Sequence, residues 1–288
     1  MIIKEADNKN EDIEILKNLL ARSEVNEVTK QKIEQKIKFI QSGIKGEHEA
    51  AYEINFHYGA HTDWVVIHDL RIEHEGRVAQ IDHILLNRYL DIWVCESKRF
   101  SEGVAINDYG EFSMFINGKP RGFPSPFQQN RKHIDVLNAM FDAKVVTLPT
   151  RFGFTIRPVI KGLVLVSKNA RVTRPSTRVN GIDDLVKVDQ IQTRITNRKR
   201  ILSVRKRISL DTLEKFALRL TDQHIPQQIN WHAKFGLTYT PAHRNLSLSC
   251  YSCGALVTEN VSKFCHTNNA RFSGNVYCIR CQSNLRYS

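Results

Sequence analysis

The chain has 288 residues, of which 41% are hydrophobic and 25% charged, and its net charge is +12. This composition is typical of a soluble globular protein with one good core and a small second unit, not of a fibrous or disordered chain. The first residues, MIIKEADNKNEDIEIL, lack the apolar stretch of a signal peptide, and no apolar run approaches the roughly 20 residues that span a bilayer. We therefore expect a cytoplasmic protein that does not act in a membrane.

The positive charge is concentrated in two segments. Residues 187–219 carry ten Lys and Arg against three acids, a net charge of +7, and residues 241–288 carry five against one, a net charge of +4. A basic run is most often a solvated surface. Two such runs beside a nearly neutral body favour a polyanionic partner instead, and nucleic acid is the first candidate.

The N-terminal part of the chain has helical periodicity. Apolar residues recur at helical spacing through residues 11–42, which predicts two helices with a break near SEVNEVT (23–29). We interpret residues 1–42 as a helical N-terminal arm. Gly43 and Gly46 then mark a break, and a new helix is expected to begin at GEHEAAYEINFHY (46–58).

Residues 64–167 follow the pattern of an α/β domain. β-like runs occupy 64–72, 77–87, 91–100 and 111–117, a proline-initiated amphipathic helix is predicted over 126–141, and an apolar strand of the buried parallel type over 161–167. This order predicts a mixed sheet flanked by helices. The predicted domain spans residues 43–186, followed by a basic helical segment with a polar linker (187–246) and a cysteine-rich tail (247–288).

Two of the predicted strands carry charge where a core strand should be apolar. Glu96 and Lys98 share one face of their strand, and Asp82 lies alongside Glu96 if the two strands pair as neighbours. A buried ion pair is one interpretation. The other is a divalent cation, because two acids and one lysine leave surplus negative charge, and Mg²⁺ binds one or two carboxylates.

Glu47 is a further candidate. It begins the stripe formed by Ala50, Ile54 and Tyr58 on the core-facing side of the helix at 46–58, so it can point at the sheet. As an exposed first-turn residue it would only favour the helix dipole.

Several stretches in this order resemble a known family. They are GIKGE (43–47), VVIHDLRI (65–72), QIDHILL (80–86), ESK (96–98), SPFQQNRKHIDVL (125–137) and GLVLV (162–166). Together they are similar to the nuclease-related domain (NERD) family of the PD-(D/E)xK nucleases. The resemblance implies a restriction-endonuclease-like fold, and the family's acidic, lysine and glutamine positions would fall on Glu47, Asp82, Glu96, Lys98 and Gln129. The chain departs from the general motif at Ile81, where a proline often stands.

The chemistry implied by the resemblance is metal-assisted hydrolysis of phosphodiesters. Asp82 and Glu96 would hold Mg²⁺ or Mn²⁺, and Lys98 would orient the attacking water or stabilise the developing negative charge. Glu47 would complete the shell or hold a second ion. Gln129 would position water or phosphate, with a plain surface amide as the alternative.

Five of the six cysteines follow residue 249, which argues against a disulfide framework and for a local metal site. Cys250, Cys253, Cys278 and Cys281 form two C-x₂-C pairs that predict a structural Zn²⁺ site. Cys265 is either a packing thiol or a competing ligand. The tail resembles the zinc ribbons of some NERD proteins and of bacterial topoisomerases, and it would serve as a structural unit or would grip nucleic acid.

The leading hypothesis from the sequence is a metal-dependent nuclease, with DNA as the expected partner. A non-catalytic nucleic-acid-binding protein that keeps the fold is the alternative, and an adaptor that binds proteins through its ribbon is a third. The basic segment supplies the expected phosphate contacts, which we place at Arg198, Lys199, Arg200, Arg205, Lys206 and Arg207.

Overall fold

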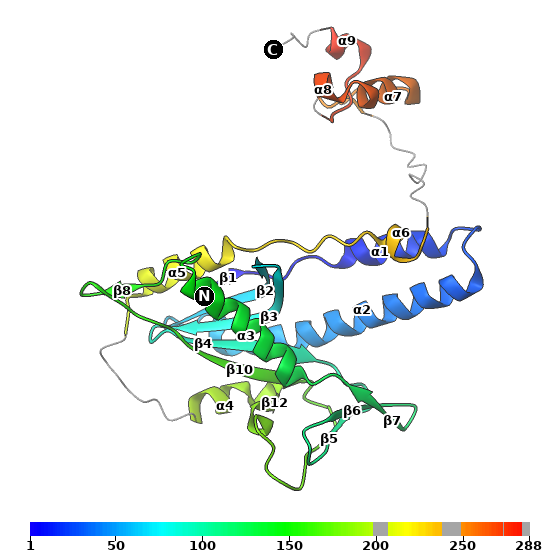
Figure 1. Cartoon of the computed structure of the whole chain (residues 1–288). Coiled ribbons are helices and arrows are strands. Elements are labelled where there is room, and N and C mark those ends of the chain that lie inside the picture. The colour runs from blue at the N-terminus through cyan, green and yellow to red at the C-terminus, as the bar shows by residue number, and fades with distance from the viewer. Residues whose placement is uncertain (198–206, 238–248, 273, 284–288) are drawn as a thin grey trace. The chain divides into compact units, whose positions relative to one another are not determined.

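The computed structural model describes residues 1–197, 207–237, 249–272 and 274–283 (Figure 1). They form two compact units, Met1–Trp231 and His232–Ser288. Within the described ranges, no helix combines the length and the apolar character needed to cross a membrane. The finer division predicted at residues 42, 186 and 246 stays a prediction.

The first unit is built on a six-stranded mixed sheet in the order β1-β2-β3-β4-β10-β12. Strands β2, β3 and β4 form an antiparallel meander, while β1, β10 and β12 run parallel to their neighbours. The mixed sheet predicted from the sequence is thereby confirmed. The strands are β1 (Ile2–Lys4), β2 (Trp64–His74), β3 (Arg77–Asn87), β4 (Asp91–Lys98), β10 (Val159–Val166) and β12 (Leu185–Lys187).

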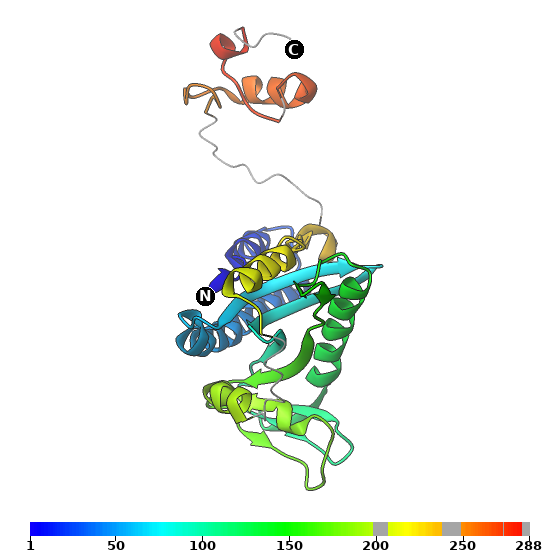
Figure 2. The ribbon, with the colours of Figure 1, turned by 90° about the vertical axis from the view of Figure 1, so that its left-hand side faces the viewer.

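Helices cover both faces of this sheet, and Figure 2 shows α2 and α3 on opposite sides of it. On one face, α3 (Pro126–Asp142) and α5 (Leu210–Thr221) pack together, with the Phe141 and Phe216 rings 5.9 Å apart. On the other face, α2 (Glu27–Ile54) and α4 (Ile191–Asn197) bury Ile54 and Ile191. Alternating strand residues supply both cores, because successive side chains point to opposite faces.

The N-terminal helices differ in one respect from the prediction. The break near residues 23–29 is present: α1 (Asn10–Leu20) ends before it, and Asn26 caps α2 by accepting a hydrogen bond from Thr29 N at 2.9 Å. The break expected at Gly43 and Gly46 is absent, because α2 continues through both to Ile54. A Cβ at Gly46 would meet Arg99 Cβ at 3.0 Å, so this glycine allows α2 to approach β4 closely.

A second, smaller sheet has four strands, all of which lie between β4 and β12 in the sequence. Its order is β11-β5-β6-β7, with β5 (Val104–Ile106), β6 (Phe112–Ile116), β7 (Lys119–Phe123) and β11 (Val172–Thr173). The run predicted at 111–117 is therefore a strand, but of this second sheet. A two-stranded hairpin, β8 (Thr150–Arg151) and β9 (Phe154–Thr155), follows α3.

The polar stretch that the sequence suggested as a linker is residues 221–236, and its part up to Trp231 belongs to the first unit. Ile225 N donates to Arg71 O at 2.9 Å, and the buried Trp231 donates through Nε1 to Asp12 Oδ1 at 2.6 Å. Trp231 therefore ties this stretch to α1. The short helix α6 (Trp231–Lys234) begins at this residue.

The second unit is small and partly helical. Helices α7 (Glu259–Thr267), α8 (Asn269–Phe272) and α9 (Ile279–Gln282) follow an isolated bridge between Ser249 and Leu256. Cys265 and Phe272 are buried in its interior. Helices thus lie between the two cysteine pairs, where the sequence analysis had assigned no elements.

Candidate active site

Asp82 lies midway along β3, and Glu96 and Lys98 lie at the C-terminal end of the neighbouring strand β4. Strands β3 and β4 are antiparallel with His83 opposite Cys95, so one step further the same register sets Asp82 opposite Glu96. Cys95 belongs to the other face, where it is buried in the α2 core.

The carboxylates of Asp82 and Glu96 differ in their contacts with donors of the protein. Asp82 Oδ2 accepts a hydrogen bond from Ser97 N at 2.7 Å, and Lys98 Nζ lies 2.6 Å from Glu96 Oε1. Glu96 is only 2% exposed, yet its Oε2 has no hydrogen-bond partner among the described residues. His133 Nδ1 lies 3.5 Å from this oxygen, and it too is buried without a hydrogen bond in that part of the chain.

Negative charge is in excess around Asp82 and Glu96. Burial raises the pKa of Asp82 well above its ordinary value, and the carboxylates of Glu96 and Glu47 raise it further. Burial also raises the pKa of Glu96, against the opposing effect of Lys98. Oxygen donors, a buried oxygen without a partner and surplus negative charge all fit a hard divalent cation.

Glu47 reaches the same region from α2. Its Oε2 lies 2.6 Å from Nζ of Lys9, a residue of the segment that joins β1 to α1. Burial lowers the pKa of Lys9, but Glu47, Asp69 and Asp82 outweigh this effect and raise it. The predicted inward orientation of Glu47 is supported, since it borders the same cavity as Asp82.

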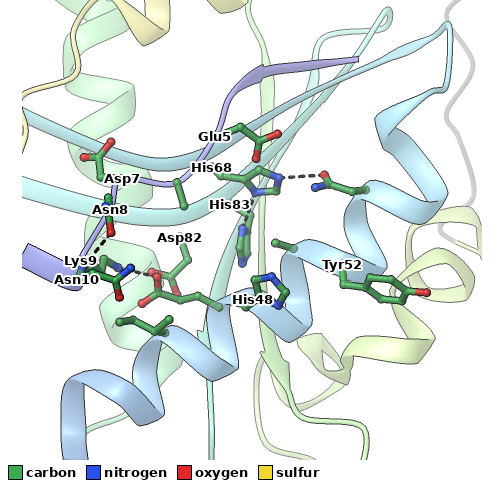
Figure 3. A pocket seen from close by; sticks show the side chains of 15 residues that line it. Glu5, Asp7, Asn8, Lys9, Asn10, His48, Tyr52, His68, Asp82 and His83 are labelled. Carbon is green, nitrogen blue, oxygen red and sulfur yellow. Dashed lines mark hydrogen bonds and ion pairs between the residues drawn. The ribbon is translucent and has the colours of Figure 1, made fainter. Parts of the chain in front are cut away.

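That cavity has a volume of about 410 Å³. Figure 3 shows His68, Asp82 and His83 entering it from the sheet, His48 from α2, and the segment Glu5–Asn10 along its border. The cavity gives a ligand direct access to Asp82.

Residues 42–166 match the family model described as NERD, nuclease-related domain. We call residues 42–166 the NERD domain after this match. No curated protein matches the chain, and no solved structure does either. The matched range contains all five candidate catalytic residues and extends from the last turns of α2 to the end of β10.

In the NERD domain, α3 presents a residue that the sequence analysis did not select. Gln129 is exposed, whereas the next residue, Asn130, is buried and donates through Nδ2 to Val94 O at 2.9 Å and Leu163 O at 3.0 Å. His133 lies one turn further on the same face. Both were detectable as polar residues on the buried stripe of this helix, but only its apolar members were considered.

A second polar network lines the NERD cavity and was also missed. His68 Nδ1 lies 2.8 Å from His83 Nδ1, while His83 Nε2 contacts Ser97 Oγ and His68 Nε2 contacts Asn55 Oδ1, both at 2.9 Å. Burial lowers the pKa of His68 to about 4 and that of His83 well below its ordinary value, so both rings are neutral near pH 7. The available signal was a histidine within each of two apolar runs, VVIHDLRI (65–72) and QIDHILL (80–86).

The predicted phosphate contacts after the NERD domain are described only in part. Arg198, Lys199, Arg200, Arg205 and Lys206 lie outside the described residues. Arg207 is exposed, and its Nη2 lies 3.2 Å from Asp63 Oδ1. The role of this segment stays a prediction.

The four predicted thiol ligands converge in the second unit. The sulfur atoms of Cys250, Cys253, Cys278 and Cys281 all lie within 4.8 Å of one another, and Cys253 and Cys278 are 3.7 Å apart. Zn–S bonds of about 2.3 Å in a tetrahedron require sulfur separations of roughly 3.8 Å. The cluster is therefore compatible with one zinc ion.

Hydrogen bonds change the pKa of two of these thiols in opposite directions. Burial opposes ionisation of Cys250, but the backbone N–H groups of Cys278, Cys253 and Ser252 outweigh it and lower its pKa to about 6. Hydrogen bonds to Cys253 and Cys278 raise the pKa of Cys281 to about 12. Zinc binds cysteine as the thiolate. A bound Zn²⁺ ion would therefore remove the difference in protonation between Cys250 and Cys281.

Cys265 lies apart from the cluster. It is fully buried, accepts a hydrogen bond from Tyr277 N at 3.4 Å and from Gln282 Nε2 at 3.3 Å, and donates to Tyr277 O at 3.5 Å. These contacts favour the packing interpretation of this thiol.

Proposed function

We propose that the chain is a metal-dependent nuclease that hydrolyses phosphodiester bonds, with DNA as its substrate. The observation that carries this proposal is the buried Glu96, one oxygen of which has no partner among the described residues, beside Lys98 and opposite Asp82, which borders the cavity. Burying such a carboxylate without full pairing costs several kcal/mol, which suits a site that binds a cation.

The residues divide the chemistry between them. Asp82 and Glu96 would hold Mg²⁺ or Mn²⁺, which polarises the phosphate and lowers the pKa of bound water. Lys98 stabilises the negative charge that develops on the phosphate oxygens or orients the attacking water. Ser97 fixes the direction of the Asp82 carboxylate through its backbone N–H.

The remaining candidates have supporting roles. Glu47 completes the metal shell from α2. Gln129 is exposed near the N-terminus of α3, where it can reach water or a phosphate oxygen. The basic segment around Arg198–Arg207 contacts phosphates, and the Zn²⁺-bearing second unit adds nucleic-acid affinity through Tyr251, Arg271 and Arg280.

The second candidate is a non-catalytic nucleic-acid-binding protein with a nuclease fold. It is favoured by the pairing of Glu96 with Lys98 and of Glu47 with Lys9, because paired carboxylates are less available to a metal. The presence of Asp82, Glu96 and Lys98 together favours catalysis.

One assay separates the two functions. The full chain is incubated with plasmid, linear and single-stranded DNA and with RNA, in Mg²⁺, Mn²⁺ or EDTA, and cleavage is followed on gels. We expect metal-dependent cleavage of DNA by the wild type, none by Asp82→Asn, and wild-type cleavage by the exposed control Asp211→Asn. Binding without cleavage by a homogeneous wild-type preparation would establish the non-catalytic alternative.

A further inference from the structure

One lysine reaches the candidate active site from outside the NERD domain. Lys9 precedes the matched residues by more than 30 positions, yet its Nζ lies 2.6 Å from Glu47 Oε2. Both side chains are only about a quarter exposed, at 28% for Lys9 and 24% for Glu47. Such a short, sheltered contact is stronger than an ordinary surface ion pair.

The backbone before Lys9 is held in place by several contacts. Asp7 N donates to Asp69 Oδ2 at 3.1 Å, and the Asp7 carboxylate contacts Lys4 Nζ at 2.7 Å and His224 Nε2 at 2.8 Å. Asp69 is 2% exposed and has a left-handed backbone conformation, with φ of +52°, which is uncommon for a residue other than glycine. These contacts of Asp7 help to place Lys9 beside Glu47.

The two residues of the Lys9–Glu47 contact also border two cavities. The cavity of about 410 Å³ reaches Asp82, and a neighbouring cavity of about 250 Å³ reaches Asp69. Lys9 and Glu47 line both cavities, as do Asp7 and Asn8. Separation of Lys9 from Glu47 would free the Glu47 oxygen beside both cavities.

We propose that Lys9 is a tethered cation that competes with the divalent metal for the active-site carboxylates and so weakens metal binding. An ammonium group beside Glu47, Asp69 and Asp82 offsets their mutual repulsion, and it repels an incoming cation. Metal binding then requires Lys9 to withdraw from Glu47. This inference rests on the metal site of the proposed function, but its test needs no cleavage.

The first test measures Mn²⁺ affinity of the full zinc-loaded chain without substrate, from the electron paramagnetic resonance signal of free Mn²⁺. Lys9→Met should bind Mn²⁺ about tenfold more tightly than the wild type, because one positive charge near the site is removed. Lys9→Arg keeps the charge and should bind as the wild type does. The matched control is Lys17→Met, which removes an exposed lysine of α1 and should change nothing.

A double variant locates the effect. Lys9→Met should give little gain in the Asp82→Asn background, because the site has lost a ligand there. An unchanged or weaker Mn²⁺ affinity of Lys9→Met, or the same gain in the Asp82→Asn background, would overturn the inference. Absence of Mn²⁺ binding to wild type and variant alike would overturn it as well.

A second readout follows the segment itself. The Asp7 amide donates to Asp69 at the border of the site, so hydrogen exchange of residues 5–9 should become faster when Mn²⁺ displaces Lys9. Slower or unchanged exchange would contradict displacement. Cleavage assays on the same samples separate the two proposals: tighter Mn²⁺ binding without cleavage refutes only the nuclease, and cleavage with unaltered Mn²⁺ affinity refutes only the competition.

Discussion

The two candidate metal sites of this chain are built in opposite ways. The thiol cluster uses two C-x₂-C pairs whose four sulfurs already lie within 4.8 Å of one another. The carboxylate site draws Glu47 from a helix and Asp82 and Glu96 from two strands, and each acid has a protein donor, namely Lys9, Ser97 and Lys98 respectively. One site is assembled by short-range turns, the other by the sheet.

This difference indicates different tasks. Four converging thiols match a closed structural zinc site with no coordination position left for a substrate. At the carboxylate site Glu47 and Asp82 instead border a cavity, and the buried Glu96 keeps one oxygen, Oε2, without a partner in the described residues. A catalytic cation needs such an arrangement, since it must retain positions for water and substrate.

The largest effect is expected from loss of zinc. Chelation should unfold the second unit and leave Met1–Trp231 folded, because a unit of this size has too small a core to fold without its metal. Circular dichroism and limited proteolysis with and without chelator measure this. Unfolding of the first unit by a chelator would remove the contrast between the two sites.

Zinc stoichiometry identifies the ligands. Elemental analysis should find one zinc per chain in the wild type and in Cys265→Ser, and none in Cys278→Ser. Loss of zinc from Cys265→Ser would mean that the four paired cysteines are not the ligand set.

Next in size is the effect of the carboxylate-site lysine. Lys98→Met removes the cation 2.6 Å from Glu96, and we expect cleavage to fall by a factor on the order of 10²–10³. Nucleic-acid affinity should remain within a factor of about two to three, because phosphate contacts are placed elsewhere. Gel assays and fluorescence anisotropy measure the two quantities, and a parallel loss of affinity would show that Lys98 binds the ground state instead.

Removal of the Asn130 side chain, which bridges β4 and β10, should destabilise the first unit. Asn130→Ala leaves the carbonyl oxygens of Val94 and Leu163 without this donor, at a cost of roughly 1–3 kcal/mol per buried group left unsatisfied. Urea unfolding monitored by fluorescence gives the free energy of unfolding. The neighbouring exposed Gln129→Ala should cost less than about 0.5 kcal/mol and is the matched control.

Acid should destabilise the first unit through His68. Its pKa in the folded chain is about 4, below its ordinary value of 6.5, so stability is fully present above pH 6.5 and falls as the pH drops towards 4, by up to about 3 kcal/mol. His68→Gln should flatten the dependence of the unfolding free energy on pH in this range. The exposed His48→Gln should leave it unchanged, and an unaltered slope in His68→Gln would assign the effect to other groups.

The smallest change per residue is expected in the basic segment. Neutralising Arg198, Lys199, Arg200, Arg205, Lys206 and Arg207 should flatten the slope of log affinity against log salt on duplex DNA by up to about 0.9 per lost phosphate contact. A steeper or equal slope would place these residues away from the nucleic acid. In that case the second unit would have to supply the phosphate contacts.

Local patterns in the sequence determined most of the elements. Period-two runs gave β2, β3 and β4, the proline-initiated amphipathic stretch gave α3, and Asp82, Glu96 and Lys98 could be assigned to one sheet face, because strand alternation and antiparallel pairing are short-range rules. The C-x₂-C spacing similarly identified the four converging thiols.

Only the tertiary structure decided contacts between segments far apart in the chain. Gly46 suggested a helix break, but α2 continues through it, and the missing side chain leaves room for Arg99. Lys9 meets Glu47, and Asn130 bridges two strands, only after the sheet and its helices have packed. Periodicity identifies the face on which a side chain lies, whereas long-range packing determines which atoms lie opposite it.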